Sequence, residues 1–321
     1  MNNFAPVVIP TLNRHMHLKQ CVESLSSCTH ADKTDLFIFL DYPLKDGHKA
    51  GYELIKTYLP NIKGFKTVNV IMRENNFGPV ANFSKSIEYV FERYDRLIFS
   101  EDDNEFSPNF LDYINKGLDK FENNNNVFAV CGYNFPAESP PKYKYNYFFY
   151  QRFSAWGTGI WKNKFPVEPV WDYNKIAEFT NNKNYANILK RQAERHYYRL
   201  LYCIKNKITI YGDEVLILIC IIRNQYCVYP VESKVRNNGH DGTGVHGSLI
   251  VNNLYSKQKI DDSTEFEYNG EAPLVDKDFD RFYRSSLKIS KMALIKGLIL
   301  KPIAGSYLEK VLKRLIKGVK C

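Results

Sequence analysis

Three consecutive carboxylates, Glu101-Asp102-Asp103, follow the apolar run Leu97–Phe99. Neighbouring carboxylates repel one another, but a divalent cation makes such a cluster favourable because Mg²⁺ and Mn²⁺ take hard oxygen ligands and bridge to substrate phosphates. A solvated acidic turn ahead of a helix is the alternative interpretation. The end of a parallel strand is where open α/β sheets bind ligands, so a strand at 96–100 favours the metal interpretation.

Polar side chains follow other apolar runs in the same way. Thr11 and Arg14 come after the first run, and Asp41 comes directly after the second. Asp213 precedes the run Val215–Ile222. Its carboxylate has the chemistry of a general base. It also fits the first turn of a helix, where acids are favoured, and the residues alone leave both interpretations open.

The first 131 residues alternate between two patterns that can position these side chains. Short apolar segments predict strands, and segments of helical period separate them, with Asn13 and Ser107-Pro108 as the expected start signals of two helices. Such an alternation implies a mostly parallel sheet with helices on both faces. The predicted strands are 5–10, 35–40, 66–72, 96–100 and 127–131, and the predicted helices are 14–26, 52–59, 80–93 and 107–122.

Beyond Gly132 this alternation stops. Residues 133–173 are rich in Pro, Tyr and Trp and predict a structured loop region, and residues 184–206 predict a long helix. Residues 213–223 predict a helix, with a strand as the alternative. A loop with four glycines follows at 236–248.

The motifs resemble those of GT-A glycosyltransferases. Four segments occur in the order in which this fold presents them: Pro6–Arg14, Asp41, Asn76-x-Gly78 and Leu97–Asp103. Within the fold, the chain is similar to the N-acetylglucosaminyltransferase I family. That family carries a strand ending in Glu-Asp-Asp and a helix that opens near a proline, here Pro108.

Three downstream segments extend the resemblance to residues 5–250. Phe153–Trp161, which contains Trp156 and Gly157, resembles the donor segment of the family. Gly212–Glu214 resembles the acidic pair that includes the base, and Gly244–Gly247, which contains His246, resembles the loop that closes over the nucleotide.

The resemblance implies a Rossmann-like three-layer α/β/α sandwich around a mostly parallel sheet. Residues 1–250 would form the GT-A domain, with a nucleotide-sugar-binding half at 1–131 and a donor and acceptor half at 132–250. Residues 251–283 would be a linker or packing segment, and residues 284–321 a basic amphipathic helical tail.

The resemblance also assigns roles to residues. Asp103 would be the direct ligand of Mn²⁺ or Mg²⁺, and Asp213 the catalytic base. Glu101 and Asp102 would contact ribose and sugar hydroxyls. Arg14 and Asp41 would contact the uracil end of a UDP-sugar, with Asp46 as the alternative to Asp41. The rest of the expected nucleotide-sugar site is Thr11, Asn82 (where the family has a base-contacting His), Trp156, Gly157 and His246.

The implied reaction is an inverting, metal-dependent sugar transfer from a UDP-sugar to a hydroxyl of a glycan or lipid-linked saccharide. N-acetylglucosamine is the first sugar expected. Three alternatives stay open: a retaining glycosyltransferase of the same fold, a nucleotidyltransferase of the same fold, and a non-catalytic glycan- or membrane-binding protein.

Charge is concentrated at one end of the chain. The net charge is +9, and residues 284–321 hold ten basic residues and one acid, which leaves the rest neutral. A nucleic-acid binder would spread basic charge over its body, so no nucleic-acid partner is expected. Residues 306–320 divide into an apolar and a basic helical face, which suits an anionic membrane surface, with docking on the body as the alternative.

The start of the chain, Met1–Phe4, lacks the basic and apolar regions of a signal peptide. The longest uninterrupted apolar run, Val215–Ile222, has eight residues, whereas a membrane span needs about 20. We therefore expect a cytoplasmic protein, peripheral on the inner face of the plasma membrane, that acts in surface polysaccharide biosynthesis.

Overall fold

An eight-stranded sheet forms the centre of the protein. The computed structural model describes residues 4–136, 139–166, 170–239 and 258–286. The strand order is β3-β2-β1-β4-β8-β6-β11-β7, and only β8 and β7 run antiparallel to their neighbours in this sheet. The strands are β1 (Val7–Thr11), β2 (Asp35–Leu40), β3 (Thr67–Met72), β4 (Arg96–Phe99), β6 (Val127–Cys131), β7 (Tyr147–Tyr150), β8 (Thr158–Trp161) and β11 (Tyr226–Pro230).

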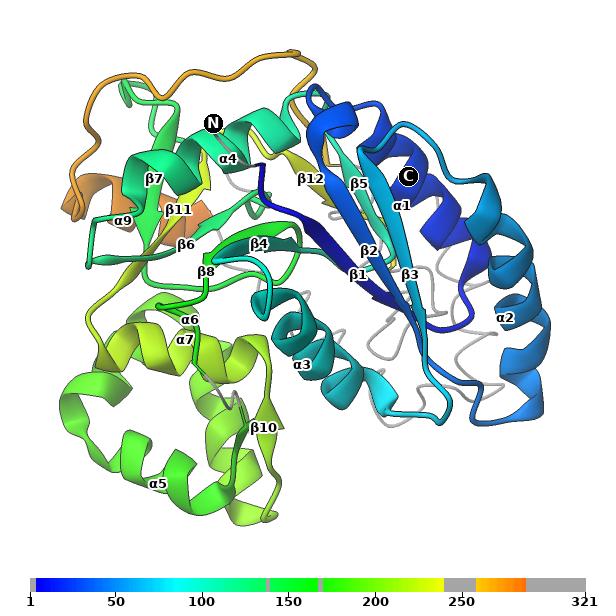
Figure 1. Cartoon of the computed structure of the whole chain (residues 1–321). Helices are drawn as coiled ribbons and strands as arrows, with labels where there is room; N and C mark the ends of the chain where they lie inside the picture. Colours follow the sequence, from blue (N-terminus) through cyan, green and yellow to red (C-terminus); the bar gives the residue numbers. More distant parts are fainter. Residues whose placement is uncertain (1–3, 137–138, 167–169, 240–257, 287–321) are drawn as a thin grey trace, which may run out of the picture.

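Helices cover both faces of this sheet (Figure 1). Alternating strand side chains feed two cores: Val7 and Ile9 face one, and Val8 faces the other. The helices α1 (His15–Ser26), α2 (Asp46–Tyr58) and α4 (Phe110–Phe121) pack into the first core, and α3 (Gly78–Phe91) and α7 (Asp213–Ile222) pack into the second. The predicted α/β fold with a mostly parallel central sheet is confirmed.

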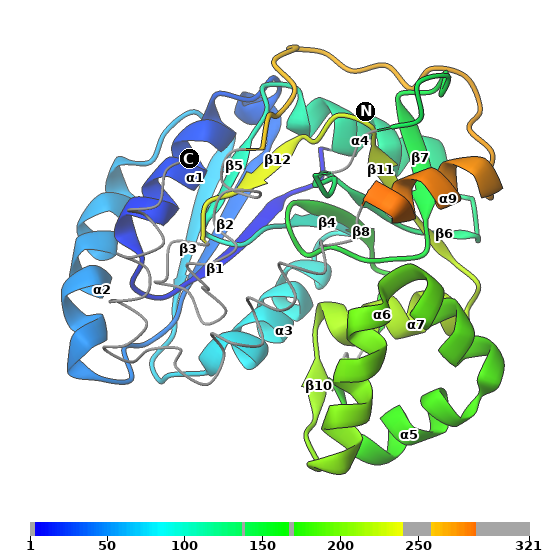
Figure 2. The ribbon, with the colours of Figure 1, turned by 180° about the vertical axis from the view of Figure 1, so that it is seen from behind.

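A small helical group lies at one end of the molecule, away from α1 and α2 in both views (Figures 1 and 2). It contains α5 (Tyr173–Asn181), α6 (Lys183–Lys205) and the two-stranded ribbon of β9 (Val170–Trp171) and β10 (Ile210–Tyr211). Two short 3₁₀ turns, Ala31–Lys33 and Leu59–Asn61, connect elements of the first half. In the part of the chain that the structure describes, no helix has the length and apolar character to span a bilayer.

Residues 258–286, which we call the strap, run along the body and end in α9 (Lys277–Ser286). The strap buries Phe266 in the first core, and α9 buries Phe279 and Tyr283 in the second, beside β7 and β11 (Figure 2). The predicted tail helix at 306–320 lies outside the described residues.

The expectation of a loop over 133–173 was wrong in part, because this region contributes two strands to the central sheet. β8 lies between β4 and β6 and runs antiparallel to both. β7 is the aromatic sequence Tyr-Phe-Phe-Tyr, buried along its whole length. Its side chains do not alternate between apolar and polar, and a short apolar run of this kind fits a buried strand or a buried helix segment equally well by periodicity.

Both predicted helix start signals were also wrong. Arg14, not Asn13, is the N-cap of α1, and it makes no side-chain cap. α4 begins at Phe110 rather than beside Pro108. The Ser107 amide donates to the Lys234 carbonyl at 2.9 Å, which keeps Ser107 in the preceding strand pairing instead of a helical turn.

Candidate active site

The polar residues predicted from the sequence meet at the carboxyl edge of the sheet. β2, β1 and β4 are parallel neighbours, so the residues that follow their last positions lie side by side. Thr11 Oγ1 donates to Asp102 Oδ2 at 2.7 Å. Arg14 bridges two acids, because it pairs with Asp102 and donates to Asp103 Oδ2 at 2.7 Å. The structure therefore brings together side chains that are about 90 residues apart, consistent with the ligand-binding edge of open α/β sheets.

Negative charge exceeds positive charge at this edge. Burial and the charges of Asp103 and Asp213 raise the pKa of Glu101 well above its usual range. Burial also raises the pKa of Asp102, although Arg14 opposes that rise. Burial would lower the pKa of Arg14, but Asp102 and Asp103 outweigh it and raise that pKa. The Arg14 guanidinium thus pairs with two of these acids, Asp102 and Asp103, while Glu101 and Asp213 add further negative charge nearby.

A short two-stranded ribbon holds Asp103 from its other side, and no sequence pattern predicted it. β5 (Asn104–Phe106) pairs antiparallel with β12 (Val235–Asn237). Asn237 Nδ2 donates to Asp103 Oδ1 at 2.7 Å, and the Asn238 amide donates to the Asp103 carbonyl at 2.8 Å. These asparagines open the glycine-rich loop at 236–248, and that composition was the one sequence signal for a close backbone approach.

Asp213 is the first residue of α7 and follows Gly212, which adopts a positive φ of 62°. Its charge contributes to the raised pKa of Glu101, so the two carboxylates face the same region. The neighbouring Glu214 turns elsewhere, because it forms an ion pair with Arg199 of α6. The run Val215–Ile222 is helical, which settles the helix-or-strand alternative.

Asp41 and Asn82 have structural partners at the same edge. Asp41 accepts hydrogen bonds from the Phe77 and Gly78 amides at 2.8 and 2.9 Å, and so ties the end of β2 to the start of α3. Asn82 is buried and accepts from Arg73 Nε at 3.0 Å. Asp46, the alternative to Asp41, begins α2 and pairs with Lys49 on the surface.

Trp156 and Gly157 precede β8, whose Thr158 pairs with Phe99 of β4. This antiparallel register places them beside the residues that follow β4. The Trp156 ring packs edge-on against Tyr133, with ring centroids 4.5 Å apart. Gly157 has a positive φ of 66° and lies against Phe110, so a side chain there would clash. His246 lies outside the described residues.

The donor chemistry of this edge fits a hard divalent cation, because its excess carboxylate oxygens are the ligands that Mg²⁺ and Mn²⁺ prefer. Among the described residues, no group of three or more His, Cys, Asp or Glu side chains is arranged to hold a metal ion. A site with one or two protein carboxylates, completed by substrate phosphates and water, is the arrangement usual for Mg²⁺. Both carboxylate oxygens of Asp103 accept hydrogen bonds in this structure, from Arg14 and from Asn237, and its role as the metal ligand stays a prediction.

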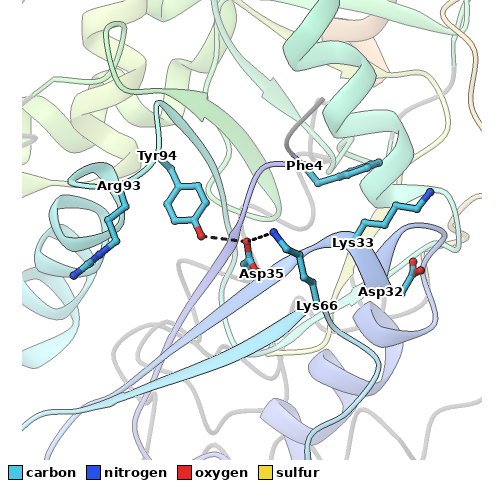
Figure 3. A pocket seen from close by; sticks show the side chains of 7 residues that line it. All are labelled: Phe4, Asp32, Lys33, Asp35, Lys66, Arg93 and Tyr94. Atoms are coloured by element: carbon cyan, nitrogen blue, oxygen red, sulfur yellow. Dashed lines mark hydrogen bonds and ion pairs between the residues drawn. The ribbon is translucent and has the colours of Figure 1, made fainter. Parts of the chain in front are cut away.

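A separate cavity of about 580 Å³ opens at the amino ends of the strands, on the edge opposite to Asp103 (Figure 3). Asp35, at the start of β2, accepts from Tyr94 at 3.1 Å and from Lys66 at 3.3 Å. Figure 3 shows Lys33 and Arg93 pointing away from this carboxylate. The cavity contains an acid that is already paired, and it is not part of the carboxylate site.

The chain matches the family described as "Glycosyl transferase family 2" over residues 7–185. This match spans more than half of the chain, so the chain belongs to glycosyl transferase family 2 and is a glycosyltransferase of the GT-A type. The finer resemblance to the N-acetylglucosaminyltransferase I family is not supported by this match and stays a prediction. No curated protein sequence matches the chain.

Two solved structures are similar over much of the chain. One is the mannosyltransferase PcManGT from Pyrobaculum calidifontis in complex with GDP-Man and Mn²⁺, with 11% identity and a TM-score of 0.36, covering 98% of this chain and 79% of that one. The other is S. aureus TarS, with 13% identity and a TM-score of 0.33, covering 70% of this chain and 36% of that one. Both TM-scores are below 0.5, so the family assignment depends on the sequence match.

Proposed function

We propose that this protein is an inverting, divalent-cation-dependent glycosyltransferase with a UDP-sugar donor. UDP-N-acetylglucosamine is the first donor to test, from the resemblance of the motifs. The acceptor would be a hydroxyl of a glycan or a lipid-linked saccharide in surface polysaccharide biosynthesis. One observation carries this proposal: Glu101, Asp102, Asp103 and Asp213 converge on the ligand-binding edge of a family 2 fold with one guanidinium among them.

The residues of this edge divide the work of a displacement reaction. Asp103 would hold the cation, which when bound supplies a Lewis acid that neutralises the charge of the leaving diphosphate. Arg14 and Thr11 keep Asp102 in place beside it. Asp213 would accept the proton of the attacking hydroxyl, and general-base help of this kind is worth about 10² to 10⁴-fold in rate. A single displacement inverts the anomeric centre.

Calorimetric titration tests donor and metal together. UDP, GDP, CMP and dTDP are titrated with Mn²⁺ or with EDTA into the wild type, and we expect heat from UDP with Mn²⁺ only. Asp103→Ala should abolish it. Asp35→Asn is the matched control, because Asp35 is also a buried aspartate but lies at the opposite edge of the sheet. Absence of nucleotide binding in the wild type under every condition contradicts the proposal.

Hydrolysis of UDP-N-acetylglucosamine, with water as acceptor, tests the base. Asp213→Asn should lower the turnover about 10² to 10⁴-fold and leave UDP–Mn²⁺ affinity unchanged. Glu214→Gln is the matched control, since this neighbouring acid pairs with Arg199 instead. The anomer released is read by proton NMR. Release of the α-anomer, or full turnover by Asp213→Asn, favours a retaining mechanism and removes Asp213 from the proposed role.

We also propose that residues 306–320 hold the enzyme on the anionic inner face of the plasma membrane. The basis is their amphipathic basic sequence, and the test is co-sedimentation with vesicles of phosphatidylcholine, with and without phosphatidylglycerol. The full chain should sediment with the anionic vesicles at low salt, and a chain that ends at Ser286 should not. Equal sedimentation of the two chains, or none, contradicts this localisation.

A further inference from the structure

A buried ion pair lies beside the β5–β12 ribbon that holds Asp103. Lys234, the residue before β12, has a side chain only 2% exposed and pairs with Asp261 of the strap, which is 10% exposed. The Lys234 ammonium lies 4.7 Å from the centroid of the Phe266 ring. A buried ion pair adds little stability over an apolar pair of similar volume. The segments that this ion pair holds together therefore matter more than its contribution to stability.

Asp261 joins three segments of the chain at this point. Besides Lys234, its carboxylate accepts from Asn109 Nδ2 at 2.8 Å, in the turn before α4. Its own amide donates to the Ser233 carbonyl at 3.0 Å. Burial would raise the pKa of Asp261, but the hydrogen bonds from Lys234 and Asn109 outweigh it and hold that pKa below its usual range. The strap, the α4 turn and the start of β12 are thus linked through one carboxylate.

The same strand leads directly to the candidate site. Lys234 and Asn237 are three residues apart, about 10 Å along an extended chain. Asn237 and Asn238 then make the side-chain and backbone contacts to Asp103. β12 has three residues and pairs with β5 in the described structure. Two groups of contacts hold its first end: the ion pair of the Lys234 side chain, and the backbone hydrogen bonds of Lys234 with Gly132 and Ser107.

We propose that Lys234 and Asp261 are positioning residues of the Asp103 site. Their ion pair anchors the start of β12, and β12 in turn places the side-chain amide of Asn237 within hydrogen-bond distance of Asp103 Oδ1. No sequence motif connected the strap with the chemistry. Through Lys234 and β12, the strap supports the candidate metal ligand Asp103. This inference deepens the proposed function and depends on it for its affinity measurement.

Calorimetry with UDP and Mn²⁺ provides that measurement. Outer-shell partners of a ligand typically change metal affinity by about 10 to 100-fold, so Lys234→Met should weaken Mn²⁺-dependent UDP binding at least about tenfold. Two control variants separate the positioning role of Lys234 from a general loss of packing. Lys164→Met removes another buried ammonium, which donates to the Phe121 and Asn124 carbonyls. Lys116→Met removes a different strap contact, to Glu267. Both controls should bind UDP like the wild type.

A double-mutant cycle tests whether Lys234 acts on Asp103 through Asn237. If Lys234 acts through Asn237, then Lys234→Met should cause no further loss of affinity in an Asn237→Ala background. Additive losses of affinity overturn the proposed route. If Lys234→Met does not fold, Asp261→Asn removes the charge pair with almost no change of shape and takes its place in the cycle.

Hydrogen exchange of the Asn238 amide provides a readout that needs no nucleotide. This amide donates to the Asp103 carbonyl, and Lys234→Met should raise its exchange rate, whereas Lys164→Met and Lys116→Met should not. If the wild type binds no UDP but the exchange result holds, the proposed function fails and the positioning role stands. Unchanged exchange in Lys234→Met, or the same increase in either control, overturns the positioning role.

Discussion

At the scale of single residues, one guanidinium lies among several acids, and this imbalance sets the charge of the candidate site. Arg14 is committed to Asp102 and Asp103. Burial, Asp103 and Asp213 raise the pKa of Glu101, and the charge of Arg14 only partly opposes that rise. Without a bound cation, the ionised Glu101 therefore opposes folding, and function rather than stability explains an acid at this position.

Glu101→Gln should stabilise the protein at neutral pH. The pKa of Glu101 is higher in the folded than in the unfolded state, so its contribution to stability falls as pH rises through the unfolded value of about 4.3. Removing the charge should therefore raise the melting temperature at pH 7. The gain should vanish near pH 4, where Glu101 is protonated in both states.

Glu105→Gln is the control of opposite sign. Burial would raise the pKa of Glu105, but hydrogen bonds from Arg236 and Asn238 outweigh it and lower that pKa. Its ionised form therefore supports folding above the unfolded pKa, and Glu105→Gln should lower the melting temperature at pH 7. Thermal melts in metal-free buffer from pH 4 to pH 8 compare the two variants. A lower melting temperature for Glu101→Gln at pH 7 would contradict the charge assignment.

At the scale of elements, the β5–β12 ribbon and the turn after β12 enclose Asp103. The register of the ribbon pairs Asn104 with Asn237, and the chain then passes over the carboxylate. Gly239 comes so close that a Cβ built there would lie 1.9 Å from Asp103 Oδ2. The Gly239 amide donates to Asn237 Oδ1 at 3.0 Å within the turn, and the Asn238 amide donates to the Asp103 carbonyl at 2.8 Å, so the turn cannot move away from Asp103 without loss of the second bond. The requirement for glycine here is one of space.

Gly239→Ala should therefore disrupt the site. The overlap forces Asp103 or the turn to shift, and overpacking of this kind costs about 1 to 3 kcal/mol. We expect Mn²⁺-dependent UDP binding to be lost in calorimetry. Gly47→Ala is the matched control: no atom lies within 4 Å of its added Cβ, and it should keep wild-type binding. Wild-type affinity in Gly239→Ala would show that the close approach is not maintained in solution.

At the scale of the whole molecule, the strap connects the β5–β12 ribbon with one end of the central sheet. It begins beside β12 and ends in α9 against β7, the last strand in the sheet order. Phe279 packs on Phe148 of β7 with ring centroids 4.4 Å apart, and Tyr283 donates to Asn134 Oδ1 at 2.7 Å. α9 therefore covers the outer part of the second core, three strand positions beyond β8.

Phe279→Ala should lower stability and leave the candidate site intact. Truncating a buried Phe to Ala costs about 3 to 5 kcal/mol, measured here by urea unfolding. UDP affinity, measured well below the melting temperature, should stay at the wild-type value, because α9 packs at the far end of the sheet from β4. Tyr198→Ala, on a side chain 60% exposed, should change stability by less than about 0.5 kcal/mol. Equal costs for the two variants would contradict the placement of α9.

Local patterns in the first half of the chain were sufficient to predict much of its structure. The predicted strands at 35–40 and 127–131 coincide with β2 and β6. Runs of buried apolar residues are typical of parallel strands covered on both faces, and this pattern depends only on neighbours in the sequence. The position of Glu101-Asp102-Asp103 after β4 follows from the same pattern.

The sequence by itself thus determined an α/β half with an acidic edge, because periodicity and strand-end position are local properties. Only the tertiary structure decided the partners of those acids. Arg14 and Asp103 are 89 residues apart, and Asn237 and Asp103 are 134 residues apart. The antiparallel insertion of β8 likewise depends on pairing with β4 and β6. Such contacts form when distant segments pack into one core, and no spacing within a single segment encodes them.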